Sequence, residues 1–144
     1  MDARLGATGI VLLGTNSAGG WPRISPCEAF AVDGDLMLGM MWQSWKARDL
    51  LRDPRVTIAT PQAEREPTDG DLKLYCTVFD VPESDRRQKY ADALGAAIKW
   101  RPTEPYHLFA VDVLRGGFIS FGDQHRLLRW SAATGIEVLR HPDD

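Results

Sequence analysis

A serine and a lysine two residues apart are the side chains in this sequence best suited to bind an anion. Ser44 and Lys46 lie where a strand-like segment ends and a short helix is expected to begin. The first amides of a helix have no partner within the helix, and the helix dipole adds partial positive charge there. A hydroxyl and an ammonium beside those amides would bind a phosphate group. The alternative is that Ser44 only caps the helix and Lys46 is solvated.

The segment that must position these two residues runs over residues 22–56. An extended run over residues 22–32 leads to Asp33-Gly34, a pair that tolerates the positive φ angles of a type I′ hairpin turn. Residues 36–42 return as a second, mostly apolar strand. The short helix then follows and ends before Asp53-Pro54, because the residue before a proline avoids the helical region.

The composition is that of an ordinary soluble globular protein and argues against several classes. Of the 144 residues, 44% are hydrophobic and 26% are charged, which predicts one domain over residues 1–144 with its own core. The net charge of −3 does not suggest a nucleic-acid binder. No apolar stretch approaches the ~18 residues of a membrane span, and the N-terminus lacks the pattern of a signal peptide.

Cysteine and histidine are sparse and scattered, so we expect no metal site. Cys27 and Cys76 form no C-x-x-C pair and are expected to be buried free thiols, which fits a reducing, cytoplasmic compartment. The histidines, His107, His125 and His141, lie far apart in the sequence. No pattern identifies a catalytic acid, base or nucleophile, so the catalytic residues stay unknown. These absences are typical of an enzyme whose chemistry belongs to a bound cofactor.

The rest of the chain reads mostly as short strands. We expect strands over residues 9–15, 56–60, 72–81, 106–114, 118–121, 126–131 and 136–140. Gly116-Gly117 is expected to be a turn, residues 61–70 a polar loop, and residues 1–7 at most a helical turn. The clearest helix is predicted over residues 83–101, with Ser84 as its cap. The Trp100 ring is expected to close over the barrel end, as part of the core rather than of a cofactor site. Many short strands with one or two helices predict a small, mainly β antiparallel barrel.

An ordered set of residues within this central segment resembles the pyridoxamine 5′-phosphate oxidase-like proteins, the FMN-binding split-barrel flavoproteins. The pattern is G-x-P-x-x-S-P, then D-G-D, then S-x-K-x-x-x-L-x-x-D-P-R-V, and it covers about a quarter of the chain. The matching residues are Gly20, Pro22, Ser25, Pro26, Asp33, Gly34, Asp35, Ser44, Lys46, Leu50, Asp53, Pro54, Arg55 and Val56. The resemblance implies a six- to eight-stranded antiparallel split β-barrel of Greek-key type.

The resemblance also implies where FMN would bind. In the family, the strand before the hairpin lies along the flavin ring, the returning strand contacts the ring and ribityl chain, and the helix start binds the phosphate. Family members often have an arginine between the matching serine and lysine, and here Trp45 takes that place, which removes a bidentate phosphate partner. The implied cofactor-binding residues are Arg23, Ile24, Ser25, Pro26, Gly39, Met40, Met41, Ser44, Trp45 and Lys46.

The family's members are typically homodimers with cofactor sites between the subunits. The same arrangement here would use residues of the partner subunit, and the candidates are Lys73, Arg126, Arg129 and Trp130. Basic side chains near the site would suit an anionic cofactor or substrate. The resemblance therefore implies a homodimer that binds FMN and a small-molecule substrate at the subunit interface.

Three functions remain open at this stage. The first, which we favour, is an FMN-dependent oxidoreductase that moves a hydride between a small molecule and the flavin N5 atom. The second is a deazaflavin-dependent reductase on the same barrel, whose longer charged tail would contact Lys46, Arg48 and Arg52. The third is a non-catalytic binding module, or a barrel that has lost its cofactor.

Overall fold

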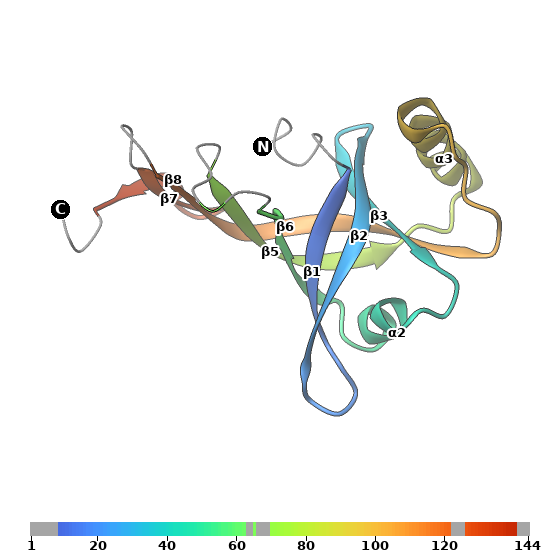
Figure 1. Ribbon diagram of the computed structural model, residues 1–144, viewed down its shortest axis with the longest axis horizontal. Coiled ribbons are helices and arrows are strands. Elements are labelled where there is room, and N and C mark those ends of the chain that lie inside the picture. The colour runs from blue at the N-terminus through green and yellow to red at the C-terminus, as the bar shows by residue number, and fades with distance from the viewer. Residues whose placement is uncertain (1–8, 63–64, 66–69, 122–125, 141–144) are drawn as a thin grey trace.

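The computed structural model of the chain describes residues 9–62, 65, 70–121 and 126–140. These residues form eight strands and two helices, arranged as a barrel with a sheet that projects from it (Figure 1). The predicted turn in residues 1–7, most of the predicted loop over 61–70, His125 and His141 lie outside the described residues. The elements are β1 (Ile10–Asn16), β2 (Pro22–Val32), β3 (Asp35–Met41), α2 (Trp45–Arg52), β4 (Arg55–Ala59), β5 (Asp71–Asp80), α3 (Ser84–Ile98), β6 (Tyr106–Ser120), β7 (Arg126–Ser131) and β8 (Gly135–Leu139).

Six of the strands close into an antiparallel barrel. The sheet order is β3-β2-β1-β4-β5-β6-β7-β8, and an additional pairing between β3 and β6 closes the ring. The closing contact runs from Met37 opposite Ala110 to Met41 opposite Tyr106. The predicted fold class, a mainly β antiparallel split barrel, is therefore confirmed. Neither helix in the described part of the chain is long and apolar enough to cross a membrane.

Alternation along the strands separates the barrel interior from an outer face. On β2, Cys27 and Ala29 are buried in the interior, whereas Pro26 is exposed and Glu28 is only partly buried. The interior is filled mainly by aliphatic side chains, among them Val11, Leu13, Leu38, Ile58 and Val78. A second cluster packs α3 against the outer face and includes Met37, Tyr90, Leu94 and Leu108. Both cysteines, as predicted, are buried free thiols.

The turn between β2 and β3 has the conformation that its sequence predicts. Asp33 and Gly34 both have positive φ angles, of 51° and 86°. Val32 pairs directly with Asp35 across this two-residue loop. Positive φ at both central residues is the mark of a type I′ turn, whose twist matches that of the strands it joins. The prediction of a hairpin at this point is confirmed.

Helix α2 has the predicted bounds but not the predicted cap. It runs from Trp45 to Arg52, with Ser44 at the N-cap position and Asp53 at the C-cap position. The Ser44 hydroxyl makes no hydrogen bond to the helix amides, which corrects the expectation that this side chain caps the helix. The hydroxyl therefore does not satisfy the amides of the first turn.

Strand β6 is longer than the sequence suggested. We expected Gly116-Gly117 to turn the chain between two strands, but both glycines lie inside a single strand. Gly116 pairs with Leu74 on one side and Trp130 on the other. A Cβ at Gly116 would come within 2.9 Å of the Leu74 Cδ2 atom. Gly116 therefore marks close packing within a sheet rather than a turn.

Helix α3 ends earlier than predicted. We expected a helix over residues 83–101, but the helix stops at Ile98, and Lys99 adopts the left-handed conformation with a φ angle of 59°. The expected cap, Ser84, is instead the first helical residue. The early stop leaves Trp100 outside the helix and 52% exposed, so the prediction that Trp100 packs in the core is wrong.

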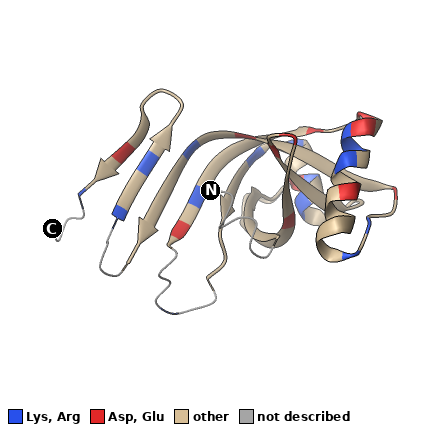
Figure 2. Cartoon of the chain, turned by 90° about the horizontal axis from the view of Figure 1, so that it is seen from above, with Lys and Arg blue, Asp and Glu red and all other residues tan. Residues whose placement is uncertain are grey.

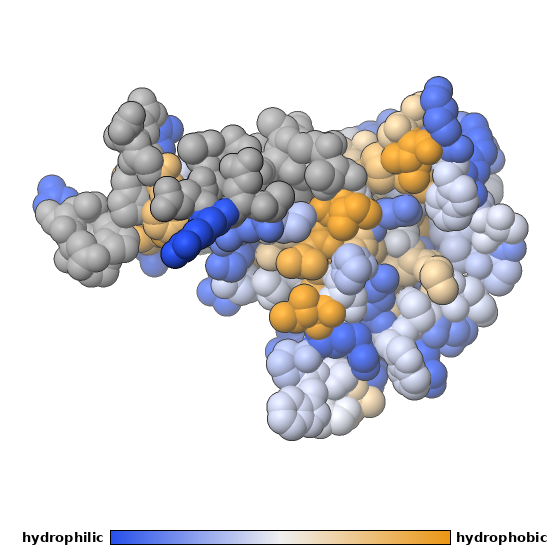
Figure 3. Space-filling model, in the orientation of Figure 1, coloured by the Kyte–Doolittle hydropathy of each residue, from blue (hydrophilic) through white to orange (hydrophobic). Residues whose placement is uncertain are grey.

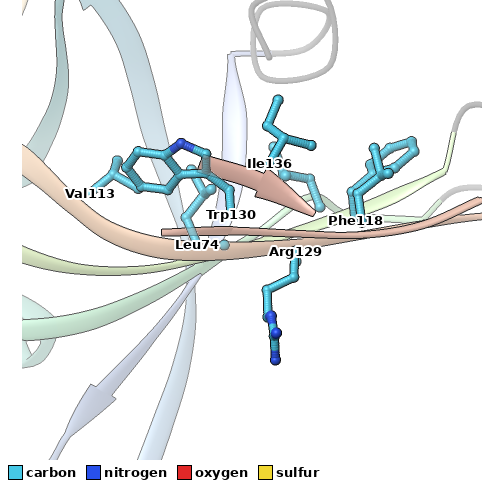
Figure 4. A pocket seen from close by; sticks show the side chains of 10 residues that line it. Leu74, Val113, Phe118, Arg129, Trp130 and Ile136 are labelled. Atoms are coloured by element: carbon cyan, nitrogen blue, oxygen red, sulfur yellow. The ribbon is translucent and has the colours of Figure 1, made fainter. Parts of the chain in front are cut away.

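A projecting sheet, formed by β7, β8 and the parts of β5 and β6 that pair with them, extends beyond the barrel (Figure 1). Its two faces differ. One face carries the paired rows Leu72–Phe118–Leu128–Val138 and Leu74–Gly116–Trp130–Ile136. The other carries Lys73, Arg129 and Glu137, and the last two form an ion pair at 2.7 Å. Figure 4 shows Arg129 pointing away from Trp130 and Ile136, which border an apolar hollow of about 490 Å³.

A buried carboxylate joins α2 to the barrel. Asp49, whose side chain is 3% exposed, accepts hydrogen bonds from Thr15 Oγ1 at 2.8 Å and Arg23 Nε at 2.7 Å. Arg52 lies 3.4 Å from its other oxygen. Burial alone would raise the pKa of Asp49, but the hydrogen bonds from Arg23 and Thr15 outweigh it and hold the pKa below its usual range. The network fixes α2, and with it Lys46, against β1 and β2.

Asp49→Asn is predicted to lower the free energy of unfolding by about 2 to 3 kcal/mol at pH 7, because the variant removes a buried charge that three groups share. A pKa lowered in the folded state stabilises the protein above the unfolded pKa, and this stabilisation is lost as the pH falls through the folded pKa. The difference from wild type should therefore shrink below about pH 4. Urea denaturation over a range of pH measures it.

The matched control is Glu137→Gln, which breaks an ion pair whose arginine is 60% exposed. Its cost should stay below about 1 kcal/mol, because solvent-exposed ion pairs contribute little. A cost for Asp49→Asn no larger than that of the control, or one that does not fall on acidification, would contradict the role assigned to this carboxylate.

Candidate functional site

A cleft of about 530 Å³ lies on the outer face of β2 and β3, and we call it the β2–β3 cleft. Lys46 of α2 borders it on one side, and α3 with the segment that follows it borders the other. Its volume is in the range of small-molecule sites. Figure 3 shows apolar side chains gathered on the face that β1 and β2 present, whereas Figure 2 shows charges of both signs on α3.

The strands bring half of the ten predicted cofactor residues to this cleft. Pro26, Gly39, Met40, Met41 and Lys46 line it. The other five do not border it. Arg23 and Ser25 alternate with Pro26 and so lie on the other face of β2, whereas Ile24 shares the face of Pro26 but lies beyond the cleft. These five are Arg23, Ile24, Ser25, Ser44 and Trp45. A role for any of the ten in binding a cofactor stays a prediction.

The donors predicted to hold a phosphate lie close to one another at the start of α2. Lys46 Nζ donates a hydrogen bond to the backbone carbonyl of Pro26 at 3.0 Å, which brings the ammonium to the edge of the cleft. The Ser44 Oγ atom is buried and has no hydrogen-bond partner among the described residues. A buried hydroxyl without a partner is uncommon and costs free energy. A phosphate oxygen at the helix start would supply the missing partner, so this donor set fits a phosphate group.

Trp45, which takes the place of the arginine in the resembled pattern, leaves the cleft open. It is 65% exposed and does not line the cleft. The guanidinium of Arg48 lies 5.0 Å from its ring centroid, and that of Arg23 lies 5.8 Å away. Both distances are within the range of cation–π contacts. Two guanidinium groups thus remain beside the position where the arginine is missing.

Trp42, just after β3, packs on the buried ring of His107. Its indole stacks on the His107 ring, with centroids 4.4 Å apart and planes within 10°. His107 is 5% exposed, and its Nε2 atom has no hydrogen-bond partner among the described residues. Burial lowers the pKa of His107. The imidazole is therefore a neutral packing group and not an exposed base.

Cys27 lies beside Lys46 but is not activated by it. Its Sγ atom lies 3.3 Å from the backbone carbonyl of Gly39 and donates a weak hydrogen bond to it. Burial raises the pKa of Cys27 to about 12, and the charge of Lys46 offsets only part of this rise. A thiol with so high a pKa stays protonated at neutral pH and is a poor nucleophile.

Several lining residues were missed by the sequence analysis. Glu28 shares the outer face of β2 with Pro26, so strand alternation alone could have found it. Tyr90 and Trp100 come from α3 and the segment after it, and no sequence signal places them. Tyr90 is fully buried, its hydroxyl has no partner among the described residues, and a Cβ built on Gly39 would overlap that hydroxyl. The Tyr90 phenol therefore occupies the space that a side chain at residue 39 would fill.

No family model matches the chain, and no curated protein matches it. Solved structures do match. A protein of the pyridoxinephosphate oxidase family from Clostridium acetobutylicum, related to general stress protein 26 of B. subtilis, has a TM-score of 0.70 at 14% identity, over 92% of each chain. A heme-binding protein from Mycobacterium smegmatis has a TM-score of 0.68 at 21% identity. That match covers 87% of this chain but 54% of the mycobacterial one.

A third similar structure is PhzG from Burkholderia lata in complex with tetrahydrophenazine-1-carboxylic acid. Its TM-score is 0.65 at 13% identity, over 91% of this chain and 80% of PhzG. At such identities the likeness establishes the fold alone. The chain has the fold of the pyridoxamine 5′-phosphate oxidase-like split barrels, as the resemblance predicted.

Gly39→Ala is predicted to lower the free energy of unfolding by about 1 to 3 kcal/mol, because the new methyl group would overlap the Tyr90 hydroxyl. Tyr90→Phe removes a buried hydroxyl that has no partner, so alone it should cost less than about 1 kcal/mol. In the Tyr90→Phe background the cost of Gly39→Ala should be smaller. Urea denaturation of the four proteins measures this coupling. Equal costs in both backgrounds would show that the phenol does not pack against β3.

Proposed function

We propose that this protein is an FMN-binding oxidoreductase that acts on a small molecule. One observation carries the proposal: the Lys46 ammonium lies at the edge of a cleft of about 530 Å³, and the buried, unpartnered Ser44 hydroxyl lies just before it at the start of α2. Helix amides, a hydroxyl and an ammonium are the donors that suit a phosphate monoester. These are also the residues to which the resemblance assigns the FMN phosphate. When bound, FMN supplies the hydride-transfer chemistry.

The cleft also suits the flat ring of a flavin. Met41, on the outer face of β3, is 79% exposed. Trp42 and Tyr106 add aromatic surface. In this proposal the chain binds the cofactor, orients it and excludes water, while no side chain of its own is the nucleophile.

The charges near the site favour FMN over a deazaflavin with a longer anionic tail. Such a tail would need a groove formed by Lys46, Arg48 and Arg52. Arg52 is already engaged, since it donates to the backbone carbonyl of Asn16 and lies within reach of Asp49. Arg52 is therefore not available to bind the anionic tail of a deazaflavin. Among the described residues the cleft also offers no exposed imidazole for an iron, because Trp42 covers the buried His107.

Lys46→Ala is predicted to weaken FMN binding about 10- to 150-fold, because a hydrogen bond to a charged group contributes about 1.5 to 3 kcal/mol. Titration followed by flavin fluorescence measures the dissociation constant. The control is Lys89→Ala, which removes an ammonium that pairs with Asp33 and does not line the cleft. The control should leave the constant unchanged. An unchanged constant for Lys46→Ala would rule out the phosphate site.

We further propose that the protein is a homodimer with its cofactor site at the subunit interface. Met41 and Trp42, which line the cleft, are large apolar side chains that are 79% and 53% exposed, and Ile24 and Trp45, which do not line it, are exposed as well.

The projecting sheet offers a second apolar surface for the partner subunit. Ile136 is 72% exposed and Val138 is 78% exposed, at the outer ends of two rows of apolar side chains that begin at Leu74 and Leu72, which pack in or against the barrel core. Exposed apolar patches of this kind mark interaction sites. The sequence analysis grouped Lys73, Arg126 and Arg129 with Trp130, but Lys73 and Arg129 lie on the face of the sheet opposite to Trp130. One surface of a partner therefore cannot present all of them to the same cofactor.

The double variant Ile136→Glu, Val138→Glu is predicted to be a monomer, because it places two charges on the apolar face of the projecting sheet. Both side chains are mostly exposed in the single chain, so the fold should persist. Sedimentation equilibrium measures the mass. Ile98→Glu on α3, at a residue that is 43% exposed, is the control and should stay dimeric. A wild-type monomer, or a dimeric double variant, would overturn this proposal.

A further inference from the structure

The β2–β3 cleft contains a carboxylate that lacks a partner. Glu28 lies on the outer face of β2, two residues beyond Pro26 and directly opposite Gly39 of β3. Its side chain is partly buried and forms no hydrogen bond or ion pair with any described residue. Burial raises the pKa of Glu28, while the charge of Lys46 lowers it. A partly buried carboxylate without a partner is costly and is uncommon in folded proteins.

Glu28 differs in this respect from the other acidic residues that the structure describes. Those that are buried or partly buried are held by a basic side chain, as Asp49 is by Arg23 and Asp71 is by Lys73. Those without a partner are exposed to water, where they need none, and they are Asp80, Asp85 and Asp112. The missing partner of Glu28 is therefore specific to the cleft.

The surroundings of Glu28 suit a cation. Trp42, Trp100 and Tyr106 line the same cleft, and the faces of such rings attract positive charge. The guanidinium of Arg87 already lies 4.3 Å from the Tyr106 ring centroid, so Trp42 and Trp100 are the rings for a ligand cation. The Tyr90 hydroxyl, which is buried and unpartnered, lies against Gly39, the residue that pairs with Glu28. Burial, and to a smaller extent the charge of Glu28, raise the pKa of Tyr90, so the phenol stays protonated.

We infer that the substrate carries a protonated nitrogen attached to a flat apolar body, and that Glu28 binds this nitrogen. The inference rests on the proposed function, because it concerns the same cleft with FMN bound. Lys46 is the one lysine or arginine among the described residues that line the cleft. Once a phosphate pairs with Lys46, the carboxylate of Glu28 has no positive charge left nearby in the cleft. A cationic substrate would supply the positive charge that pairs with Glu28.

This charge balance couples the two ligands. In the empty cleft the ammonium of Lys46 acts on Glu28 and repels an incoming cation. A phosphate on Lys46 removes that repulsion, so FMN should strengthen cation binding, and by reciprocity the cation should strengthen FMN binding. Lys46→Met, which removes the charge without FMN, should also strengthen cation binding.

Benzylamine, benzyl alcohol and phenylacetate are matched probes, because they share one ring and differ in charge. Their binding to the full chain, with and without FMN, is measured by ligand-observed NMR titration. With FMN bound, benzylamine should bind at least about tenfold more tightly than benzyl alcohol, and phenylacetate more weakly than either. Glu28→Gln should abolish the preference for benzylamine. Asp112→Asn, which removes an exposed carboxylate outside the cleft, should keep it.

Equal affinities for benzylamine and benzyl alcohol, or a preference that survives in Glu28→Gln, would overturn the inference. Flavin absorbance of the same samples reports FMN binding separately. A protein that binds FMN but shows no preference keeps the proposed function and loses the cation site. A preference that depends on Glu28 in a protein that does not bind FMN supports the cation site and overturns the proposed function.

Discussion

The buried carboxylate of Asp49 is the interaction on which the candidate site depends. It lies one turn along α2 from Lys46 and accepts hydrogen bonds from Thr15 on β1 and Arg23 on β2. A helix of eight residues is too short to be stable alone, so its contacts with the barrel must hold it in place. Lys46 and Asp49 are an i,i+3 pair and so are neighbours on the helix surface, and the polar network that holds Asp49 therefore also fixes the position of Lys46.

The outer face of β2 and β3 is where binding surfaces remain, because α3 covers only part of it. Tyr90 of α3 packs against Gly39, and this contact sets the boundary between the part of the face that α3 covers and the part that forms the cleft. The cleft and the apolar side chains around it are two consequences of this incomplete cover. Cofactor, substrate and partner subunit, as proposed here, all use surface that the single chain cannot bury. The pairing of Lys46 with an anion and of Glu28 with a cation would leave the cleft electrically balanced.

Features fixed by neighbouring residues could be predicted from the sequence, whereas those fixed by packing could not. The turn at Asp33-Gly34 depends on local φ angles, and the stop of α2 depends on the proline that follows Asp53. The Gly116-Gly117 pair misled the prediction, because the absence of a side chain permits close packing inside a strand as readily as a turn. The place of Tyr90 in the cleft follows from how α3 docks, which no local pattern encodes. Glu28 could be predicted only in part. The alternation of side chains along β2 places it on the same face as Pro26, but it does not show that its carboxylate lacks a partner.

The central claim is that the start of α2 binds the phosphate of a flavin at the β2–β3 cleft. Titration of the full chain with FMN and with riboflavin, followed by flavin fluorescence, tests it directly, because the two ligands differ only in the phosphate. The account predicts saturable binding of one FMN per chain, with riboflavin at least about tenfold weaker. Equal affinities for the two flavins, or no saturable binding of FMN, would contradict it.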